Sequence, residues 1–317
     1  MDYRQFVCAV EKQMNKKMTG GVKTGLHTAV KNNGKERTGV LIETPGVNIS
    51  PTIYLEEYYE NYLNGVPVEK IVEEIISFYS AIKQEKSWDY EKILCYEGVK
   101  DRIVFKLINA EQNRKFLSTV PHMGFLDLAI VFYVLLEVTK EGTAAMTVSL
   151  SHMEQWQVGT DMLWEDALNN VKRLLPAEFF TMNYALKEIL KKSTVQDNTS
   201  ASENLLLGNV RDRDGMYVLT NHIRNYGASC IAYPHLLEMI GNILEADFYV
   251  LPSSVHEVVI TPRHREISCE ELDEMVKDIN ETQVEPEEVL SNHAYLYERG
   301  SGRLRIGTER EPGRMMG

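Results

Sequence analysis

The longest apolar run in the chain, residues 126–138, limits the folds that the chain can adopt. The run is 13 residues long and contains Asp127, so it is too short to cross a bilayer, which takes about 20 residues. Its apolar, β-rich composition predicts a buried strand. Hydrophobic residues make up 44% of the 317-residue chain and charged residues 25%. These values are typical of a soluble globular protein of one or two domains with a sizeable core.

The first part of the chain predicts a hairpin followed by two helices. Two strand-like runs, residues 22–30 and 37–43, flank Asn32-Asn33-Gly34, and Asn-Gly between two such runs is a strong hairpin signal. Ser50 is a preferred N-cap and Pro51 suits a first helical position, so we expect a helix over 51–64. Apolar residues with a 3.6-residue period predict a second helix over 67–82.

The rest of the chain mixes strands and helices. Strands are expected at 101–109, 126–138, 145–150, 216–220, 228–232, 248–251 and 256–261, and helices at 160–175, 234–245 and 268–279. The sequence therefore predicts an α+β fold with a mixed, largely antiparallel sheet flanked by helices. We expect an N-terminal region at 1–98, a mixed domain at 99–298 and a disordered, arginine-rich and glycine-rich tail at 299–317.

Two segments resemble each other at an offset of 69 residues. Residues 168–182 and 237–251 share leucine, alanine and phenylalanine positions, and each would be a helix that runs into a strand. His152 and His222 would then follow two equivalent strands. This echo is either an internal duplication or the ordinary similarity of amphipathic helices that precede aromatic strands.

The net charge of −12 is unevenly distributed. Residues 1–40 carry eight basic and three acidic side chains, and residues 299–317 carry five arginines and two glutamates, so the body at 41–298 has a net charge of −20. Such a body repels a phosphate backbone, which argues against nucleic acid as its main partner. The two basic ends could still bind nucleic acid in a salt-sensitive way, which is a further hypothesis. The simpler interpretation is that they are solvated termini.

The segment 252–258 is the strongest candidate for chemistry. It places Ser253, Ser254, His256 and Glu257 at a turn between strands, with His222 as a further candidate. A serine–histidine pair could act as nucleophile and base, but no G-x-S-x-G motif is present. His256-Glu257 begins like the H-E-x-x-H zinc motif, but no second histidine follows. The simpler interpretation is a tight turn in which a serine satisfies free backbone groups.

Tyr54, Tyr58 and Tyr62 are four residues apart, which would place them on one stripe of the expected helix. The stripe would be either a ligand-binding face or a packing surface against a neighbouring helix. The four cysteines are scattered and form no C-x-x-C pair, so buried thiols are expected rather than a zinc site. We expect no cofactor and no bound metal. No phosphate-binding loop is found in the sequence.

Asn48-Ile49-Ser50-Pro51-Thr52-Ile53-Tyr54-Leu55 and Pro252-Ser253-Ser254-Val255-His256-Glu257-Val258 resemble motifs of a bacterial family known only as a domain of unknown function. That family is common among hypothetical proteins of gut clostridia. The resemblance spans roughly residues 1 to 297 and implies no catalytic residue.

These observations favour a non-enzymatic cytoplasmic module that binds a protein or a small ligand and does not associate with a membrane. A cytoplasmic location is expected because residues 1–6 lack the apolar stretch of a signal peptide. The alternative is a hydrolase or metal-dependent enzyme centred on residues 252–258.

Overall fold

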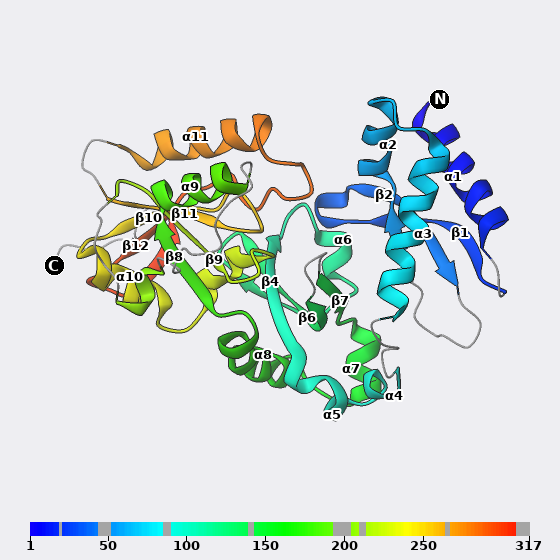
Figure 1. Cartoon of the computed structure of the whole chain (residues 1–317). Coiled ribbons are helices and arrows are strands. Elements are labelled where there is room, and N and C mark those ends of the chain that lie inside the picture. Colours follow the sequence, from blue (N-terminus) through cyan, green and yellow to red (C-terminus); the bar gives the residue numbers. More distant parts are fainter. Residues whose placement is uncertain are drawn as a thin grey trace. The chain divides into compact units, whose positions relative to one another are not determined.

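The computed structural model describes residues 1–18, 21–43, 52–84, 90–138, 143–192, 204–208, 214–263 and 267–308 (Figure 1). The chain divides into two compact units, Met1–Gly98 and Val99–Gly317. Every strand pairing among the described residues is antiparallel, and helices accompany each sheet. The fold class is therefore α+β, as the sequence predicts. Among these residues, no helix has both the length and the apolar character needed to cross a membrane.

The first unit combines a three-stranded sheet, of order β1-β2-β3, with helices. Its elements are α1 (Tyr3–Lys17), β1 (Lys23–Val30), η1 (Asn32–Gly34), β2 (Glu36–Glu43), β3 (Thr52–Tyr54), α2 (Glu56–Leu63), α3 (Val68–Gln84) and α4 (Tyr90–Ile93). The fully buried core side chains come from α1, β2, α3 and Leu55, and they include Phe6, Val10, Val40, Ile42, Ile71 and Ile75. The core forms because the apolar stripe of each helix faces the apolar side of the sheet.

The predicted hairpin is confirmed as β1 and β2, which pair from Lys23↔Glu43 to Val30↔Glu36. The chain reverses at Asn33 and Gly34, whose φ angles are 57° and 69°. Asparagine and glycine tolerate this left-handed conformation, which explains the strength of the local signal.

The helix predicted over residues 51–64 begins later, so that part of the prediction is wrong. Thr52–Tyr54 form β3, which pairs with β2, and α2 starts at Glu56 with Leu55 as its N-cap. Ser50 and Pro51 lie outside the described residues. Main-chain pairing with β2 and the burial of Ile53 outweigh the local helix-start signal.

The second unit contains a four-stranded sheet built around one long strand. Its elements are η2 (Lys100–Arg102), β4 (Ile103–Asn109), α6 (Arg114–Leu117), β5 (His122–Phe125), β6 (Leu128–Val138), β7 (Thr143–Thr147), α7 (Leu150–Trp156) and α8 (Thr160–Leu174), which follow α5 (Tyr96–Val99). Strand β6 pairs with β4, β5 and β7. Trp164 of α8 contacts the Phe105 and Phe132 rings on one face of the sheet. Ala129 and Val131 belong to a cluster with α6 on the other face. Strand β6 is therefore covered on both sides, and its sequence is apolar at every position except Glu137.

A six-stranded sheet of order β13-β12-β10-β11-β9-β8 completes the second unit. Its elements are β8 (Ala177–Thr181), α9 (Met182–Lys192), η3 (Leu205–Leu207), β9 (Tyr217–Asn221), η4 (Gly227–Ala232), α10 (Leu236–Leu244), β10 (Phe248–Leu251), β11 (Val258–Pro262), α11 (Cys269–Thr282), β12 (Tyr295–Glu298) and β13 (Arg303–Ile306). Leu272 of α11 packs with Tyr249 and Leu296. Gly241 of α10 lies beside the rings of Phe248 and Tyr297. Neighbouring strand residues point to opposite faces, so α10 and α11 cover opposite sides of the sheet (Figure 1).

Two local predictions for the second unit are wrong. Residues 228–232 form the 3-10 helix η4 rather than a strand. In the tail, Arg303–Ile306 form β13, which pairs with β12, so the expectation of disorder fails for residues 299–308. The composition of the tail, with few apolar residues, did not indicate this edge strand. The strand is held by main-chain pairing and by an ion pair in which Arg305 Nη2 lies 3.5 Å from Glu298 Oε1. Residues 309–317 lie outside the described part.

The two copies of the internal echo have different surroundings. The first copy would run from β7 to β8, which lie in different sheets, whereas the second would run from β9 to β10 within one sheet. His152 lies inside α7, while His222 directly follows β9. The shared pattern is therefore limited to a helix that leads into a strand, once as α8–β8 and once as α10–β10.

Candidate functional site

The turn between β10 and β11 contains the residues that the sequence singled out. Ser254 is 8% exposed, and its Oγ accepts a hydrogen bond from the backbone N–H of His256 at 3.0 Å. The backbone oxygen of Ser253 accepts a hydrogen bond from the N–H of Leu290 at 3.1 Å. Ser254 thus fixes the turn through its hydroxyl, as expected of serine at such a position, whereas Ser253 contributes through its backbone oxygen.

His256 has a contact at each ring nitrogen. Its Nδ1 accepts a hydrogen bond from the N–H of Tyr226 at 3.3 Å, which leaves the proton on Nε2, and Nε2 lies 3.3 Å from Oε1 of Glu288. The ring also stacks on Tyr226, with 5.7 Å between centroids. A general base must have a ring nitrogen available to its nucleophile, and both nitrogens of His256 are engaged by groups other than Ser254.

The other two candidates behave differently. Burial raises the pKa of the Glu257 carboxyl; Glu288 also raises that pKa, while His256 and Arg224 lower it. Arg224 itself forms an ion pair with Glu188. The side chain of His222 is exposed, and the backbone N–H of His222 donates to the Pro176 oxygen at 3.1 Å. The structure therefore brings Ser254, His256 and Glu257 into one region, and within the described residues no hydrogen bond or ion pair joins the His222 side chain to them.

Among the described residues, no group of three or more histidine, cysteine, aspartate and glutamate side chains has the arrangement of a metal site.

The tyrosines expected on one helical stripe lie on two elements. Tyr54 is on β3, where Lys31 Nζ lies 3.8 Å from the centroid of its ring. Tyr58 and Tyr62 are on α2 and pack against the core of the first unit, with the Tyr62 ring 5.3 Å from that of Phe6. Burial raises the pKa of Tyr58. Tyr58 and Tyr62 are thus packing residues, and Tyr54 is separated from them because it lies on β3 rather than on the helix.

The segment between α11 and β12, residues 283–294, runs beside the β10–β11 turn. Val255 N–H donates to the Glu288 oxygen at 2.9 Å, and Ser291 N–H donates to the Pro252 oxygen at 3.0 Å. Asn109, at the end of β4, donates through Nδ2 to the Leu290 oxygen at 3.0 Å. These contacts tie the segment to both sheets of the second unit.

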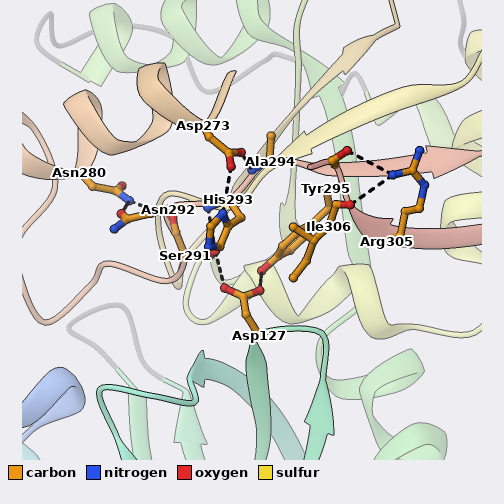
Figure 2. A network of polar contacts seen from close by, with 11 residues as sticks. Asp127, Asp273, Asn280, Ser291, Asn292, His293, Ala294, Tyr295, Arg305 and Ile306 are labelled. Atoms are coloured by element: carbon orange, nitrogen blue, oxygen red, sulfur yellow. Dashed lines mark hydrogen bonds and ion pairs between the residues drawn. The ribbon is translucent and has the colours of Figure 1, made fainter. Parts of the chain in front are cut away.

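Asp127 is a second anchor for this segment (Figure 2). It lies in the β5–β6 turn next to Leu126, whose φ of 55° is uncommon for a bulky residue. Its two carboxylate oxygens accept hydrogen bonds from Ser291 Oγ and Tyr295 Oη, each at 2.6 Å. Burial raises the pKa of Tyr295, and the Asp127 carboxylate raises it further, so the phenol keeps its proton and donates. The Asp127 carboxylate therefore joins a turn of the four-stranded sheet to the segment that leads into β12 of the six-stranded sheet.

An open pocket with a cavity volume of about 450 Å³ lies at the C-terminal end of α11. It is lined by Gln112, Asn280, Glu281, Thr282, Gln283, Val284, Glu285, Pro286 and Val289. Most of this lining belongs to the end of α11 and the segment that the Asp127 and Asn109 contacts hold in place. Its volume falls within the range typical of small-ligand sites, roughly 300–1,000 Å³.

Asn280 belongs to the wall of this pocket and is 7% exposed. Its Nδ2 donates to the Ser291 oxygen at 2.9 Å and to Asn292 Oδ1 at 2.8 Å (Figure 2). Its Oδ1 is buried and accepts no hydrogen bond from any described residue. A buried acceptor without a donor costs about 1–3 kcal/mol, and this oxygen lies beneath the pocket surface, out of contact with solvent.

Sequence reasoning missed both Asp127 as an anchor and the pocket. The signal for Asp127 was a carboxylate within an apolar run, which must find donors when the run is buried. The signal for the pocket was the stretch 269–288, which contains nine acidic residues and one lysine.

A family model described as a family of unknown function (DUF5688) matches residues 3–299. No curated protein and no solved structure matches the chain.

Proposed function

Since the chain belongs to this family of unknown function, we propose, on the geometry of its second unit, that it is a non-enzymatic binding module. Its ligand, a small molecule or a side chain of a partner protein, enters the pocket at the C-terminal end of α11. The observation that carries this proposal is the pocket itself, with a cavity volume of about 450 Å³ and a lining of carboxylate, amide, hydroxyl and aliphatic side chains.

The surroundings of the pocket support binding more than catalysis. Its lining contains amide, hydroxyl, carboxylate and aliphatic groups, which suit recognition, and no histidine, cysteine or serine. The alternative enzyme, a hydrolase or metal-dependent enzyme at residues 252–258, has less support because both ring nitrogens of His256 are engaged and Ser254 bonds the backbone. The anchored segment 283–294 favours a preformed site, which reduces the entropy lost on binding.

The proposal places the protein in the bacterial cytoplasm, in agreement with the family resemblance of its motifs. Cys8, Cys95, Cys230 and Cys269 are free thiols, which suits a reducing compartment. The acidic body argues against nucleic acid as the partner.

A ligand-observed NMR screen of amines, carboxylic acids, sugars and nucleosides against the full chain tests the proposal. Gln112→Trp places a large ring at the exposed edge of the pocket, and Met162→Trp on the exposed side of α8 is the matched control. We expect at least one compound class to bind the wild type and Met162→Trp and to lose affinity for Gln112→Trp by about tenfold or more. The proposal fails if Gln112→Trp leaves every bound class unaffected, or if no class binds.

A further inference from the structure

We propose that the outer edge of β1 in the first unit pairs with the same edge of a second copy of this chain, so that two three-stranded sheets join into one continuous sheet. This inference concerns a surface outside the α11 pocket and goes beyond the proposed binding function. The partner is a second copy because the exposed part of β1 complements itself in apolar pattern, in length and in charge.

The main-chain groups along part of this edge have no partner. Strand β1 lies at the end of the three-stranded sheet. The N–H and the oxygen of Thr24 bond the Asn15 side chain at 3.1 Å each, so they point away from β2. Alternate residues of an antiparallel strand direct their N–H and C=O groups to the same side. Those of Leu26, Thr28 and Val30 therefore also point away from β2, and no described residue hydrogen-bonds to them.

Another edge of the protein is covered where β1 is not. Strand β8 ends the six-stranded sheet. The Asn204 side chain accepts from the N–H of Phe179 and donates to the oxygen of Ala177, at 3.1 Å each, so it takes the place of a neighbouring strand. Asn15 does the same for β1, but only at the start of the strand. An uncovered strand edge is a template for pairing with another chain, which leaves residues 26–30 open to such pairing.

The exposed side chains of β1 fit a second copy of the strand. Leu26 is 39% exposed and Val30 is 66% exposed, and both point to the same face of the sheet as Thr28. Antiparallel pairing about a two-fold axis at Thr28 places Leu26 opposite the partner's Val30, and Val30 opposite the partner's Leu26. Apolar cross-strand pairs of this kind stabilise sheets, and they cover large side chains that a single copy leaves exposed.

The ends of the open edge coincide in this register. Thr24, whose outward groups are bonded by Asn15, falls opposite the partner's Asn32, where the hairpin turn begins. The pairing therefore starts and stops at the same points in both copies and uses residues 26–30 of each strand. Because the same patch serves on both sides, the contact is isologous and closes as a dimer.

The charges of the hairpin also select this register. It places Lys31 opposite the partner's Gly25, and Lys23 opposite the partner's Asn33, so no lysine faces a lysine. A pairing centred on His27 instead would place Lys23 directly opposite the partner's Lys31. Like charges in directly opposite positions destabilise a sheet, so the register about Thr28 is the favourable one.

Sedimentation velocity of the full chain, from about 10 μM to about 1 mM, tests the inference in a range suited to a small interface. Thr28→Pro removes an N–H that points away from β2, a position at which an edge strand tolerates proline. It should raise the dissociation constant of the dimer by about tenfold or more, because two central hydrogen bonds are lost. Thr28→Ala is the matched control. It also loses the 3.2 Å contact with Thr38 Oγ1 but keeps the N–H, so the dissociation constant should change less than about threefold.

A second pair of variants tests the apolar contact. Val30→Lys places a charge opposite the partner's Leu26 and should weaken the dimer by about tenfold or more. The matched control is Leu63→Lys on α2, since Leu63 is 63% exposed in the same unit but lies away from the edge of β1. The dissociation constant of this control should stay within about threefold of the wild type. Circular dichroism of all variants checks that each one is folded.

Amide hydrogen exchange locates the interface. Exchange at Leu26 and Val30 should slow as the concentration of the wild type rises, and it should not slow in Val30→Lys. The inference is overturned if the chain stays monomeric throughout, if the dimer survives both Thr28→Pro and Val30→Lys, or if the controls weaken it equally. A monomeric chain in which an extended acidic peptide protects these amides would assign the edge to another protein and would also overturn the inference.

Discussion

Replacing Asp127 by alanine tests whether one carboxylate holds the two sheets of the second unit together. In the folded protein this carboxylate accepts hydrogen bonds of 2.6 Å from Ser291 Oγ and from Tyr295 Oη. Both donor residues are fully buried, with 0% exposure. Alanine at position 127 therefore leaves two buried hydroxyl groups without that acceptor, and the backbone strain at Leu126 remains.

The expected loss of unfolding free energy follows from these contacts. A buried polar group left without its partner costs about 1–3 kcal/mol, so two orphaned hydroxyls give a loss of roughly 2–6 kcal/mol. The variant Asp127→Ala/Ser291→Ala/Tyr295→Phe removes the hydroxyls as well as the carboxylate. It should recover part of the stability lost in Asp127→Ala, because replacing both partners is far less costly than leaving one unpaired.

Urea unfolding followed by tryptophan fluorescence measures the effect, since Trp156 and Trp164 both belong to the second unit. Glu154→Ala, which removes an exposed carboxylate of α7, is the control and should stay within about 0.5 kcal/mol of the wild type. The cost of Tyr295→Phe should be smaller in the Asp127→Ala background than in the wild type by about 1 kcal/mol or more. An Asp127→Ala protein within about 0.5 kcal/mol of the wild type, or strictly additive effects of the two substitutions, would refute the reasoning.

Three further outcomes follow from single side chains. Burial holds the pKa of His152 below its usual value of 6.5, so the unfolded chain takes up the proton first and the stability of the protein should fall as the pH drops below 6.5. In His152→Asn the urea midpoint should therefore vary less between pH 7 and pH 5. An unchanged dependence of the urea midpoint on pH would contradict the assignment. Burial raises the pKa of Glu257, so the unfolded chain loses its proton first as the pH rises past 4.5, and the stability of the folded protein falls. Glu257→Gln should therefore raise the melting temperature at pH 7 but not at pH 4. A lower melting temperature of this variant at pH 7 would show that the ion partners of Glu257 dominate. An added Cβ at Gly227 would lie 2.5 Å from the His256 oxygen; Gly227→Ala should therefore cost about 3 kcal/mol in urea unfolding, whereas Gly159→Ala, with open space around it, is the control.

The elements that the sequence predicts well are those specified by neighbouring residues. The hairpin depends on Asn33 and Gly34, which adopt the left-handed conformation that the turn needs. The capping box at Ser268 is present as expected, with Ser268 Oγ accepting from the Glu271 N–H. The α+β class also follows from the sequence, because helical and strand periodicities alternate along the chain.

The errors occur where distant residues outweigh local preference. The start of the helix after Pro51 is displaced because Thr52–Tyr54 pair with β2. Residues 228–232 have the composition of a strand but form η4, where the Cys230 thiol donates to the Thr220 oxygen at 3.3 Å. The tail contains an edge strand because β12 offers it a pairing partner.

The candidate site could be predicted only in part. The sequence drew attention to Ser254, His256 and Glu257, and the structure does place them in one region, but the partners of His256 come from Tyr226 and Glu288. Those partners are 30 and 32 residues away along the chain, and no local pattern specifies such pairings.

By itself the sequence determined the secondary-structure class, the buried character of the strand that contains residues 128–138, and the acidic body, because periodicity and charge are properties of residue order and type. Only the tertiary structure decided that Asp127 reaches Ser291 and Tyr295, and that Asn280 is left with an unpaired acceptor in the wall of an acidic pocket. The physical reason is that hydrogen-bond satisfaction depends on which groups folding brings within about 3 Å of each other, and the groups concerned lie up to 168 residues apart.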